Sequence, residues 1–457
     1  MTQKKAMAKA PAEHDFTKGP ILGPLVRFML PVLAALFLQS LYGAVDLLVV
    51  GRFATSGDVS GVSTGAQLMM TITNVVANFA MGATIMLGQK LGQGRSDECG
   101  RIIGSGIRLF TIIGLVLTVI VFAGAPLLAT ALSVPEEAYS MAVDYIRICG
   151  AGIIVITAYN LIGSIFRGIG DSNTPLITVA IACVCNIFGD LLLVAVFHMG
   201  AAGAALATVG AQLVSVVASL FIIARRGMPF PFSKKDLSGR AEDIRRIVSL
   251  GLPLVVSALL VDLSFLVILK IINSLGIQIS AGVGVAEKVC AFIMLVSVAF
   301  MQSMASFVSQ NFGAGLYDRA KMALKCGIGL SLACGIVIGA FTFFRGDLLV
   351  GIFTEDTELI KIGAEYLKAY AIDTVLTAFL FCFTGFFNGV GMTRFVMIQG
   401  IVSALGIRVP VSYIMSRQVP VSVFKIGLAT PCSTVVQIIL CFIALRWFTK
   451  KYGRSNS

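Results

Sequence analysis

The chain has 457 residues, of which 57% are hydrophobic and only 13% are charged. Soluble globular proteins carry about twice this share of charge, so the composition excludes an ordinary soluble domain. The formal net charge of +12 does not indicate a nucleic-acid partner, because membrane proteins keep Lys and Arg in their cytoplasmic loops.

Twelve stretches of the chain are long and apolar enough to span a membrane. A helix of about 20 residues crosses the ~30 Å hydrocarbon core. We expect an all-α polytopic membrane protein with spans near 25–51, 64–90, 101–124, 142–168, 175–197, 200–224, 247–273, 283–309, 321–344, 363–389, 394–416 and 422–448. No apolar run precedes the first span, so we expect no cleavable signal peptide and targeting by the first span itself.

Basic residues gather in one of the two alternate sets of loops. The set that contains both chain ends is rich in Lys and Arg, whereas the other set holds only five basic residues: Arg52, Arg345, Lys361, Arg417 and Lys425. Positive loops stay in the cytoplasm, so both termini are expected there, in the plasma (inner) membrane of a prokaryote. The expected parts are a cytoplasmic tail (1–24), an N-lobe (25–224), a cytoplasmic linker (225–246), a C-lobe (247–448) and a second tail (449–457).

The second half of the sequence repeats the first about 221 residues later. Two glycine-containing motifs recur: GQKLGQG at 88–94 returns as SQNFGAG at 309–315, and FRGIG at 166–170 returns as FNGVG at 387–391. Six spans per half give both halves the same orientation. We therefore expect two pseudo-symmetric six-helix bundles that face a shared cleft, an architecture typical of carriers.

Pro31 and Pro253 occupy matching places in the first and seventh spans. A proline inside a helix removes a backbone hydrogen bond and allows a bend. Each proline is a candidate hinge. A fixed kink that only improves packing is the alternative interpretation.

Four oxygen-bearing side chains of the N-terminal half are expected at one level in the membrane. An ionisable residue deep in a span costs about 2.5–3.5 kcal/mol, so Asp46 and Asp190 each need a reason. Asn186 lies one helical turn from Asp190, and Thr208 lies in the next span. Carboxylate, amide and hydroxyl oxygens suit Na⁺, whereas a proton needs only the carboxylates. Structural hydrogen bonding between helices is the alternative.

The C-terminal half contains a second pair of acidic residues within its spans. Asp262 and Asp373 are matched in depth, roughly 16–18 Å from the outer face. They are candidates for a further cation or substrate site, with plain hydrogen bonding to neighbouring helices as the alternative. We expect no other metal site, since the chain has only two histidines, His14 and His198.

These features together resemble the MATE (multidrug and toxic compound extrusion) family over residues 20–448. The resemblance rests on the six-plus-six arrangement, on Pro31 with Asp46 in the first span, on the two glycine motifs and on Asn186 with Asp190. It implies a MATE/MOP-type fold and a cation-coupled antiporter that exports organic, often cationic amphipathic compounds in exchange for H⁺ or Na⁺.

The resemblance also implies roles for particular residues. Asp46, Asn186, Asp190 and Thr208 match the cation site of the DinF-like branch, and Tyr145 is a looser match to a tyrosine there. In NorM-like carriers, acidic residues of spans 7 and 10 bind the cation. Asp262 fits the first of these positions approximately, whereas Thr377 occupies the second. The family implies no cofactor, and we expect a monomer surrounded by membrane lipids.

Three other functions fit the sequence less well. A flippase for lipid-linked sugars or other polyisoprenoid intermediates would share the fold, but it would need several basic residues for pyrophosphate, and the spans contain few away from their ends. An enzyme is not expected, because the chain lacks the phosphate-binding loop and the common hydrolase motifs. Scattered single acidic residues in a duplicated bundle fit an alternating-access carrier better than they fit a channel.

Overall fold

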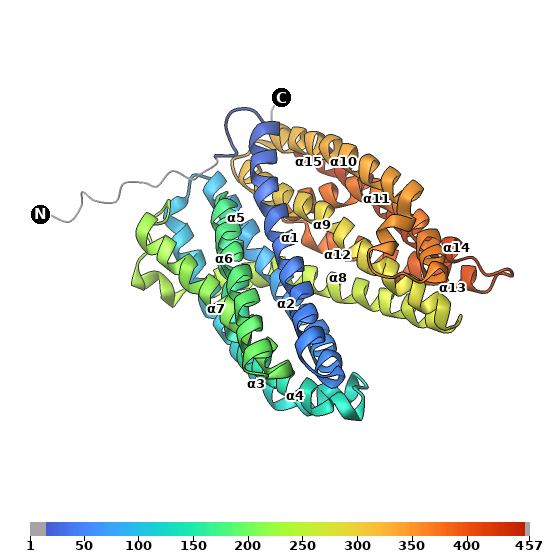
Figure 1. Ribbon diagram of the computed structural model, residues 1–457. Helices are drawn as coiled ribbons and strands as arrows, with labels where there is room; N and C mark the ends of the chain where they lie inside the picture. The colour runs from blue at the N-terminus through green and yellow to red at the C-terminus, as the bar shows by residue number, and fades with distance from the viewer. Residues whose placement is uncertain (1–14, 453–457) are drawn as a thin grey trace, which may run out of the picture. The chain divides into compact units, whose positions relative to one another are not determined.

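The computed structural model describes residues 15–452, and over this range it consists of helices without any strand (Figure 1). The helices are α1 (Leu22–Phe53), α2 (Ser56–Gly92), α3 (Cys99–Ala131), α4 (Tyr139–Ala151), α5 (Ile153–Ile169), α6 (Asn173–Asp190), α7 (Gly200–Arg226), α8 (Ala241–Asn273), α9 (Ile277–Gly313), α10 (Tyr317–Gly351), α11 (Thr357–Gly389), α12 (Thr393–Ser403), α13 (Val409–Ser416), α14 (Val423–Gly427) and α15 (Ala429–Tyr452). Short segments between them are η1 (Ser96–Glu98), η2 (Glu136–Ala138), η4 (Lys234–Ser238) and two π-helical turns, η3 (Leu191–Val196) and η5 (Ala404–Arg408).

Within the described residues, eleven helices or helix runs are long and apolar enough to cross a membrane. The bent pair Glu136–Ala151 and Ile153–Ile169 supplies a twelfth if it forms one span. Many large apolar side chains face outward, Leu127 and Phe188 among them. Such exposure suits contact with lipid. The structure thus confirms the all-helical, multi-span fold.

The bend of 52° between α4 and α5 falls at Gly152, where the chain lies close to α7. A Cβ on this residue would lie 2.6 Å from methyl groups of Val209 on α7, so only glycine allows so close an approach. The apolar pattern predicted one continuous span over 142–168, because a single glycine does not interrupt hydrophobic periodicity.

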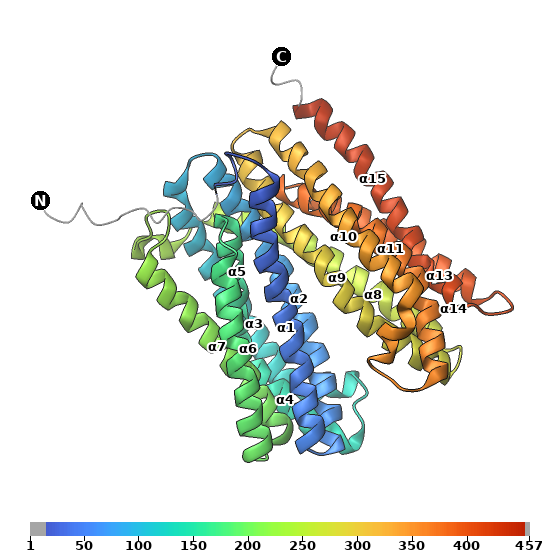
Figure 2. The same cartoon turned by 45° about the horizontal axis from the view of Figure 1, so that its top comes forward.

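The helices form two compact units. The first contains Leu30–Gly251, and the second contains Phe16–Met29 together with the chain from Leu252 onward. In the first unit α6 packs along α7 and α2 along α5, and in the second α11 packs against both α9 and α10 (Figure 2). Each boundary falls immediately before a Leu–Pro pair. The first turns of α1 therefore belong to the second unit, and those of α8 to the first.

The repeated glycine motifs form the ends of helices. Gly94, Gly170, Gly315 and Gly391 all have φ between +72° and +85°. This left-handed conformation favours glycine, which has no Cβ, and it is common just after a helix. Turn geometry therefore accounts for these glycines of the repeat without invoking a binding site.

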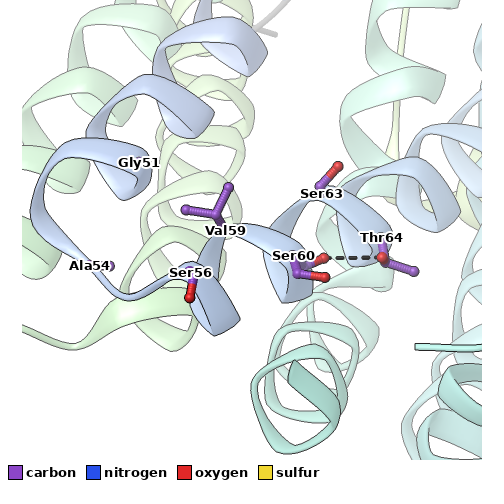
Figure 3. A pocket seen from close by; sticks show the side chains of 7 residues that line it. All are labelled: Gly51, Ala54, Ser56, Val59, Ser60, Ser63 and Thr64. Atoms are coloured by element: carbon purple, nitrogen blue, oxygen red, sulfur yellow. Dashed lines mark hydrogen bonds between the residues drawn. The ribbon is translucent and has the colours of Figure 1, made fainter. Parts of the chain in front are cut away.

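The short turn between α1 and α2 is fixed by the side chain of Asp58. Its carboxylate accepts hydrogen bonds from the backbone N–H and the hydroxyl of Thr55 (3.1 and 2.6 Å), and from the backbone N–H of Ala201 in the first turn of α7 (2.9 Å). Acidic side chains are favoured near helix N-termini. Beside this turn lies an open hollow of about 600 Å³ (Figure 3), lined by Gly51, Ala54, Ser56, Val59, Ser60, Ser63 and Thr64.

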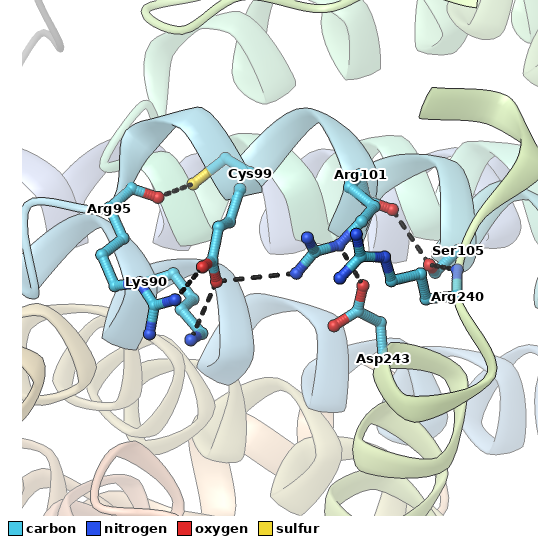
Figure 4. A network of polar contacts seen from close by, with 8 residues as sticks. Lys90, Arg95, Cys99, Arg101, Ser105, Arg240 and Asp243 are labelled. Atoms are coloured by element: carbon cyan, nitrogen blue, oxygen red, sulfur yellow. Dashed lines mark hydrogen bonds and ion pairs between the residues drawn. The ribbon is translucent and has the colours of Figure 1, made fainter. Parts of the chain in front are cut away.

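The segment that joins α7 to α8 packs onto the first unit. Arg101 on α3 donates a hydrogen bond from Nε to Asp243 (2.8 Å), and Ser105 accepts one from the backbone N–H of Arg240 (2.9 Å) (Figure 4). A Cβ on Gly104 would overlap the carbonyl oxygen of Asp236, so glycine lets η4 lie directly against α3. This ordered segment lies within the predicted linker, 225–246.

The segment before α1 packs onto the second unit in a comparable way. Phe16 is fully buried, and its ring centroid lies 4.9 Å from that of Phe307 on α9. Arg319 on α10 donates hydrogen bonds to the carbonyl oxygens of Phe16, Lys18 and Gly19 (2.9, 2.8 and 2.7 Å). A guanidinium offers five donors in a fixed plane, which suits several carbonyls presented together.

A candidate cation site in the first unit

Asp46 on α1 and Thr208 on α7 form the best-defined contact of the predicted site. The Thr208 hydroxyl donates a hydrogen bond to Oδ2 of Asp46 over 3.1 Å. Asp46 is 6% exposed. A carboxylate buried to this degree needs compensation from hydrogen bonds or from a positive charge. The single hydrogen bond from the Thr208 hydroxyl supplies only part of that compensation.

Asn186 and Asp190 on α6 complete the cluster. Both are fully buried and lie beside the carboxylate of Asp46. Within the described residues, five buried polar atoms here have no hydrogen-bond partner: Oδ1 of Asp46, both carboxylate oxygens of Asp190, and the oxygen and nitrogen of the Asn186 amide. Buried polar atoms are normally satisfied, so this group calls for a partner such as water, a proton or an ion.

Two features of α6 bring these side chains toward α7. Gly189 has no side chain, and a Cβ there would lie 3.1 Å from the Cβ of Ala207, which neighbours Thr208. The two helices can therefore approach closely at the level of the cluster. The π-helical turn η3 begins directly after Asp190. Single π-turns are rare and occur frequently at functional sites.

Tyr145 on α4 lies beside this cluster. Its side chain is 3% exposed and lies near Asp46, Thr208 and Cys149. The ring packs over Gly65 of α2, where a Cβ would lie only 2.4 Å from Cδ1 of the ring. The structure therefore brings together all five residues predicted for the N-lobe: Asp46, Tyr145, Asn186, Asp190 and Thr208.

Sequence reasoning missed two polar residues that flank the cluster. Tyr42 lies one turn before Asp46 on α1, and Gln212 lies one turn after Thr208 on α7. These two side chains adjoin one another. Oε1 of Gln212 is buried and has no hydrogen-bond partner within the described residues. The signal was the spacing of four, because residues i and i+4 share one helix face.

The acidic residues of the second unit are in different surroundings. Asp373 on α11 is 1% exposed and accepts a hydrogen bond from Thr434 on α15 (2.6 Å). Asp262 is exposed on α8, and no hydrogen bond or ion pair joins it to Asp373 among the described residues. The Thr377 hydroxyl donates to the carbonyl of Thr374 (2.9 Å), a local bond within α11. These three residues form no cluster like that of the first unit.

Arg408 is a buried basic residue that the sequence reasoning overlooked. It lies inside the predicted span 394–416, at the last position of the π-helical turn η5, and is 5% exposed. Its Nη1 donates to the hydroxyl of Ser264 (3.2 Å), and the guanidinium lies 4.5 Å from the ring centroid of Phe265. A hydrogen bond and a cation–π contact of this kind hold a guanidinium in an apolar setting.

The family model MatE matches the chain twice, over residues 31–192 and 253–414. The chain belongs to the MatE family. Both matches begin at the proline of a Leu–Pro pair, one residue after a boundary between the two compact units. Membership makes this MatE chain a multi-pass membrane transporter and not an enzyme.

Several curated relatives cover nearly the whole MatE chain. The probable multidrug resistance protein YpnP of Bacillus subtilis is 25% identical over 403 residues, which cover 88% of this chain and 90% of that protein. The probable multidrug resistance protein NorM of Thermotoga maritima is 23% identical over 408 residues, with 88% and 86% covered. The multidrug export protein MepA of Staphylococcus aureus is 22% identical over 407 residues, with 88% and 89% covered.

Solved structures agree in fold. The crystal structure of MATE in complex with MaL6 superposes with a TM-score of 0.90 at 19% identity, covering 96% of this chain and 99% of that chain. The outward-facing conformation of a multidrug resistance MATE family transporter of the MOP superfamily gives a TM-score of 0.89 at 18% identity, with 97% and 98% covered.

Proposed function

We propose that this MatE chain is a cation-coupled multidrug antiporter, which exports small organic, often cationic and amphipathic compounds in exchange for H⁺ or Na⁺. The observation that carries the proposal is the buried cluster of Asp46, Asn186, Asp190 and Thr208, in which five polar atoms have no hydrogen-bond partner among the described residues. The names of the curated relatives, which denote multidrug resistance and export, support the class of cargo.

The chemistry of the cluster requires a positive partner. Two adjacent buried carboxylates repel each other and cannot both stay ionised without one. No Lys or Arg forms an ion pair with either carboxylate in the part of the chain that the structure describes. Carboxylate and amide oxygens are hard ligands that suit Na⁺, and a proton shared between the two carboxylates would relieve the same repulsion.

Transport requires that the cation and the cargo favour different conformations of the protein. α1 carries both Asp46 and Pro31, and Pro31 marks the start of the first unit. A change of packing at Asp46 can therefore act on the candidate hinge through one helix. The coupling is reciprocal, so cargo binding alters cation affinity by the factor by which the cation alters cargo affinity.

Dye efflux from proteoliposomes tests the proposal, with a pH gradient and a Na⁺ gradient imposed separately. We expect at least one gradient to drive efflux, and Asp46→Asn and Asp190→Asn each to abolish the gradient-driven part. Asp144→Asn is the matched control, because Asp144 is an exposed carboxylate on α4. Wild-type rates in Asp46→Asn would contradict the proposal, and rescue of a flippase-deficient strain would favour a lipid-linked sugar instead.

The remaining features of the proposal follow from membership and composition. We infer that the antiporter works as a monomer among membrane lipids, with both termini in the cytoplasm, because basic residues favour that side. Cysteine-accessibility labelling in intact cells tests the orientation, and light scattering in detergent tests the oligomeric state.

A further inference from the structure

One face of α7 carries polar side chains that continue beyond the candidate cation site. Thr208, Gln212, Ser215 and Ser219 follow one another at spacings of four, three and four residues, so they lie on one side of the helix. The last three are more than nine-tenths buried. At about 1.5 Å per residue, the four residues extend roughly 16 Å toward Arg226, where α7 ends. We call these four residues the α7 polar face.

Two polar atoms of the α7 polar face have no hydrogen-bond partner in residues 15–452. They are Oε1 of Gln212 and Oγ of Ser215, and both are buried. A hydroxyl inside a helix can donate to the carbonyl four residues earlier, as Thr157 on α5 does to Ile153, but Ser215 does not. Buried polar atoms are normally paired, so these two call for water or an ion.

Polar groups of α1 and α5 occur at the same depths. Asp46 on α1 accepts the hydrogen bond from Thr208 (3.1 Å). Gln39, about 10 Å nearer the start of α1, donates to the hydroxyl of Tyr159 on α5 (2.5 Å). α1 and α7 run in opposite directions (Figure 2), so Ser215, seven residues after Thr208, is level with Gln39. The two unpartnered atoms therefore lie between the level of the cation site and that of the bond from Gln39 to Tyr159.

The equivalent face in the second unit is used differently. The two family matches begin 222 residues apart, and this offset pairs the α7 polar face with four buried residues of α15: Thr430, Thr434, Gln437 and Cys441. Thr434 donates to Asp373 on α11 (2.6 Å), and Gln437 donates to Ser403 on α12 (2.7 Å). Polar side chains that join helices in this fold thus have partners, and the unpartnered atoms of α7 need another explanation.

We propose that the α7 polar face is the route along which the coupling cation leaves the cluster toward the cytoplasm. Side-chain oxygens and the water that they bind replace lost hydration, so they lower the cost of moving a charge through an apolar lobe. Such a route inside the first unit separates the path of the cation from that of the cargo. This inference rests on the proposed cation site and on the proposed orientation, in which Arg226 is at the cytoplasmic end.

The double variant Gln212→Leu/Ser215→Ala tests the route by its effect on rate. It removes both unpartnered atoms and leaves the cation cluster intact. We expect the maximal rate of gradient-driven dye efflux from proteoliposomes to fall about tenfold, because each lost polar contact raises the barrier to cation movement. Val217→Ala, on the exposed side of α7, is the control and should keep the wild-type rate. A wild-type rate in the double variant would overturn the proposal.

Equilibrium cation affinity separates the route from the site. It is measured on the purified protein by the shift of the unfolding temperature with Na⁺ concentration or pH. The double variant should keep this affinity within about twofold of wild type, because the route acts on rate and not on binding. A loss of affinity as large as the loss of rate would overturn the route. Asp46→Asn should abolish the shift, and its persistence would contradict the proposed cation site instead.

Thiol labelling tests whether water reaches the α7 polar face. Ser215→Cys is compared with Gln437→Cys, its counterpart in the second unit, in inside-out membrane vesicles treated with 2-aminoethyl methanethiosulfonate. Mass spectrometry locates each adduct, so the ten native cysteines do not interfere. A thiol reacts as its thiolate, which water favours, so Ser215→Cys should be modified at least about tenfold faster. Equal modification of the two cysteines would contradict the route.

Discussion

The ring of Tyr145 lies so close over Gly65 that a Cβ on residue 65 would be 2.4 Å from Cδ1 of the ring. The position of a tyrosine beside the acidic cluster thus depends on the absence of one side-chain atom on α2. Gly65→Ala must displace the ring, at a cost of about 1–3 kcal/mol for overpacking.

We expect Gly65→Ala to lower the thermal stability of the purified protein and to weaken the cation dependence of efflux. Gly210→Ala is the control, because a Cβ there meets nothing within 4 Å, and alanine favours a helix over glycine. Equal behaviour of the two variants would show that the ring is free to move.

The hydroxyl of Thr208 should contribute directly to cation affinity. Thr208→Val keeps the shape of the side chain but removes a hydroxyl oxygen and its hydrogen bond to Asp46. If Na⁺ is the coupling ion, the concentration that gives half-maximal efflux should rise about tenfold. If H⁺ is the coupling ion, the half-maximal proton concentration should fall, because the ionised carboxylate loses a donor. Thr208→Ser retains the hydroxyl and should stay close to wild type. A valine variant with unchanged cation dependence would place the cation elsewhere.

Asn186 should lower stability in the absence of its ligand. Its amide is buried, and neither polar atom has a hydrogen-bond partner in residues 15–452, so Asn186→Leu removes two buried polar atoms that no hydrogen bond compensates. We expect this variant to unfold at higher temperature, with a gain of about 1–3 kcal/mol, while gradient-driven efflux is lost. Asn78→Leu is the control: Nδ2 of Asn78 already donates to the carbonyl of Asn74 (2.9 Å), and no comparable gain is expected.

The pair Arg101–Asp243 should hold the start of α8 on the first unit. Its N–O distance is 2.8 Å, and the two side chains are 25% and 9% exposed. A double-mutant cycle with Arg101→Gln and Asp243→Asn should give a coupling energy of about 0.5–1.5 kcal/mol, measured by thermal unfolding. A coupling near zero would mean that the glycine contacts alone hold this segment.

Arg319 should protect the segment before α1 from proteolysis. Arg319→Met removes the donors to three carbonyls, and trypsin should then cleave after Lys18 several times faster than in wild type. Arg345→Met is the control, because Arg345 lies at the other end of the same helix, α10. Unchanged cleavage would show that burial of Phe16 is sufficient by itself.

The sequence predicted the parts of this fold that depend on hydrophobicity and repetition. The apolar spans, the duplicated halves and the family were all confirmed. The division of span 142–168 at Gly152 was not predicted, because the bend lies against a neighbour, Val209, that is distant in sequence. The assignment of the first turns of α1 and α8 to the opposite units was equally invisible, since it depends on tertiary contacts such as that of Phe16 with Phe307.

The candidate site, like the fold, could be predicted only in part from the sequence. Charge within an apolar run marked Asp46 and Asp190, and the structure places Asn186 and Thr208 beside them. Their ion-binding role remains a prediction. Tyr42 and Gln212 escaped notice because uncharged polar residues do not stand out in a helix. Arg408 escaped notice because its compensation by Ser264 and Phe265 is visible only after folding.

The contact between Phe16 and Arg319 joins residues 303 positions apart, and it therefore imposes an order on biosynthesis. At about 5–20 residues per second, the ribosome adds Arg319 on the order of 15–60 s after Phe16. Until then the segment before α1 lacks its Arg319 partner, because α10 (Tyr317–Gly351) does not yet exist. The segment before α1 is therefore completed only after most of the spans have been synthesised.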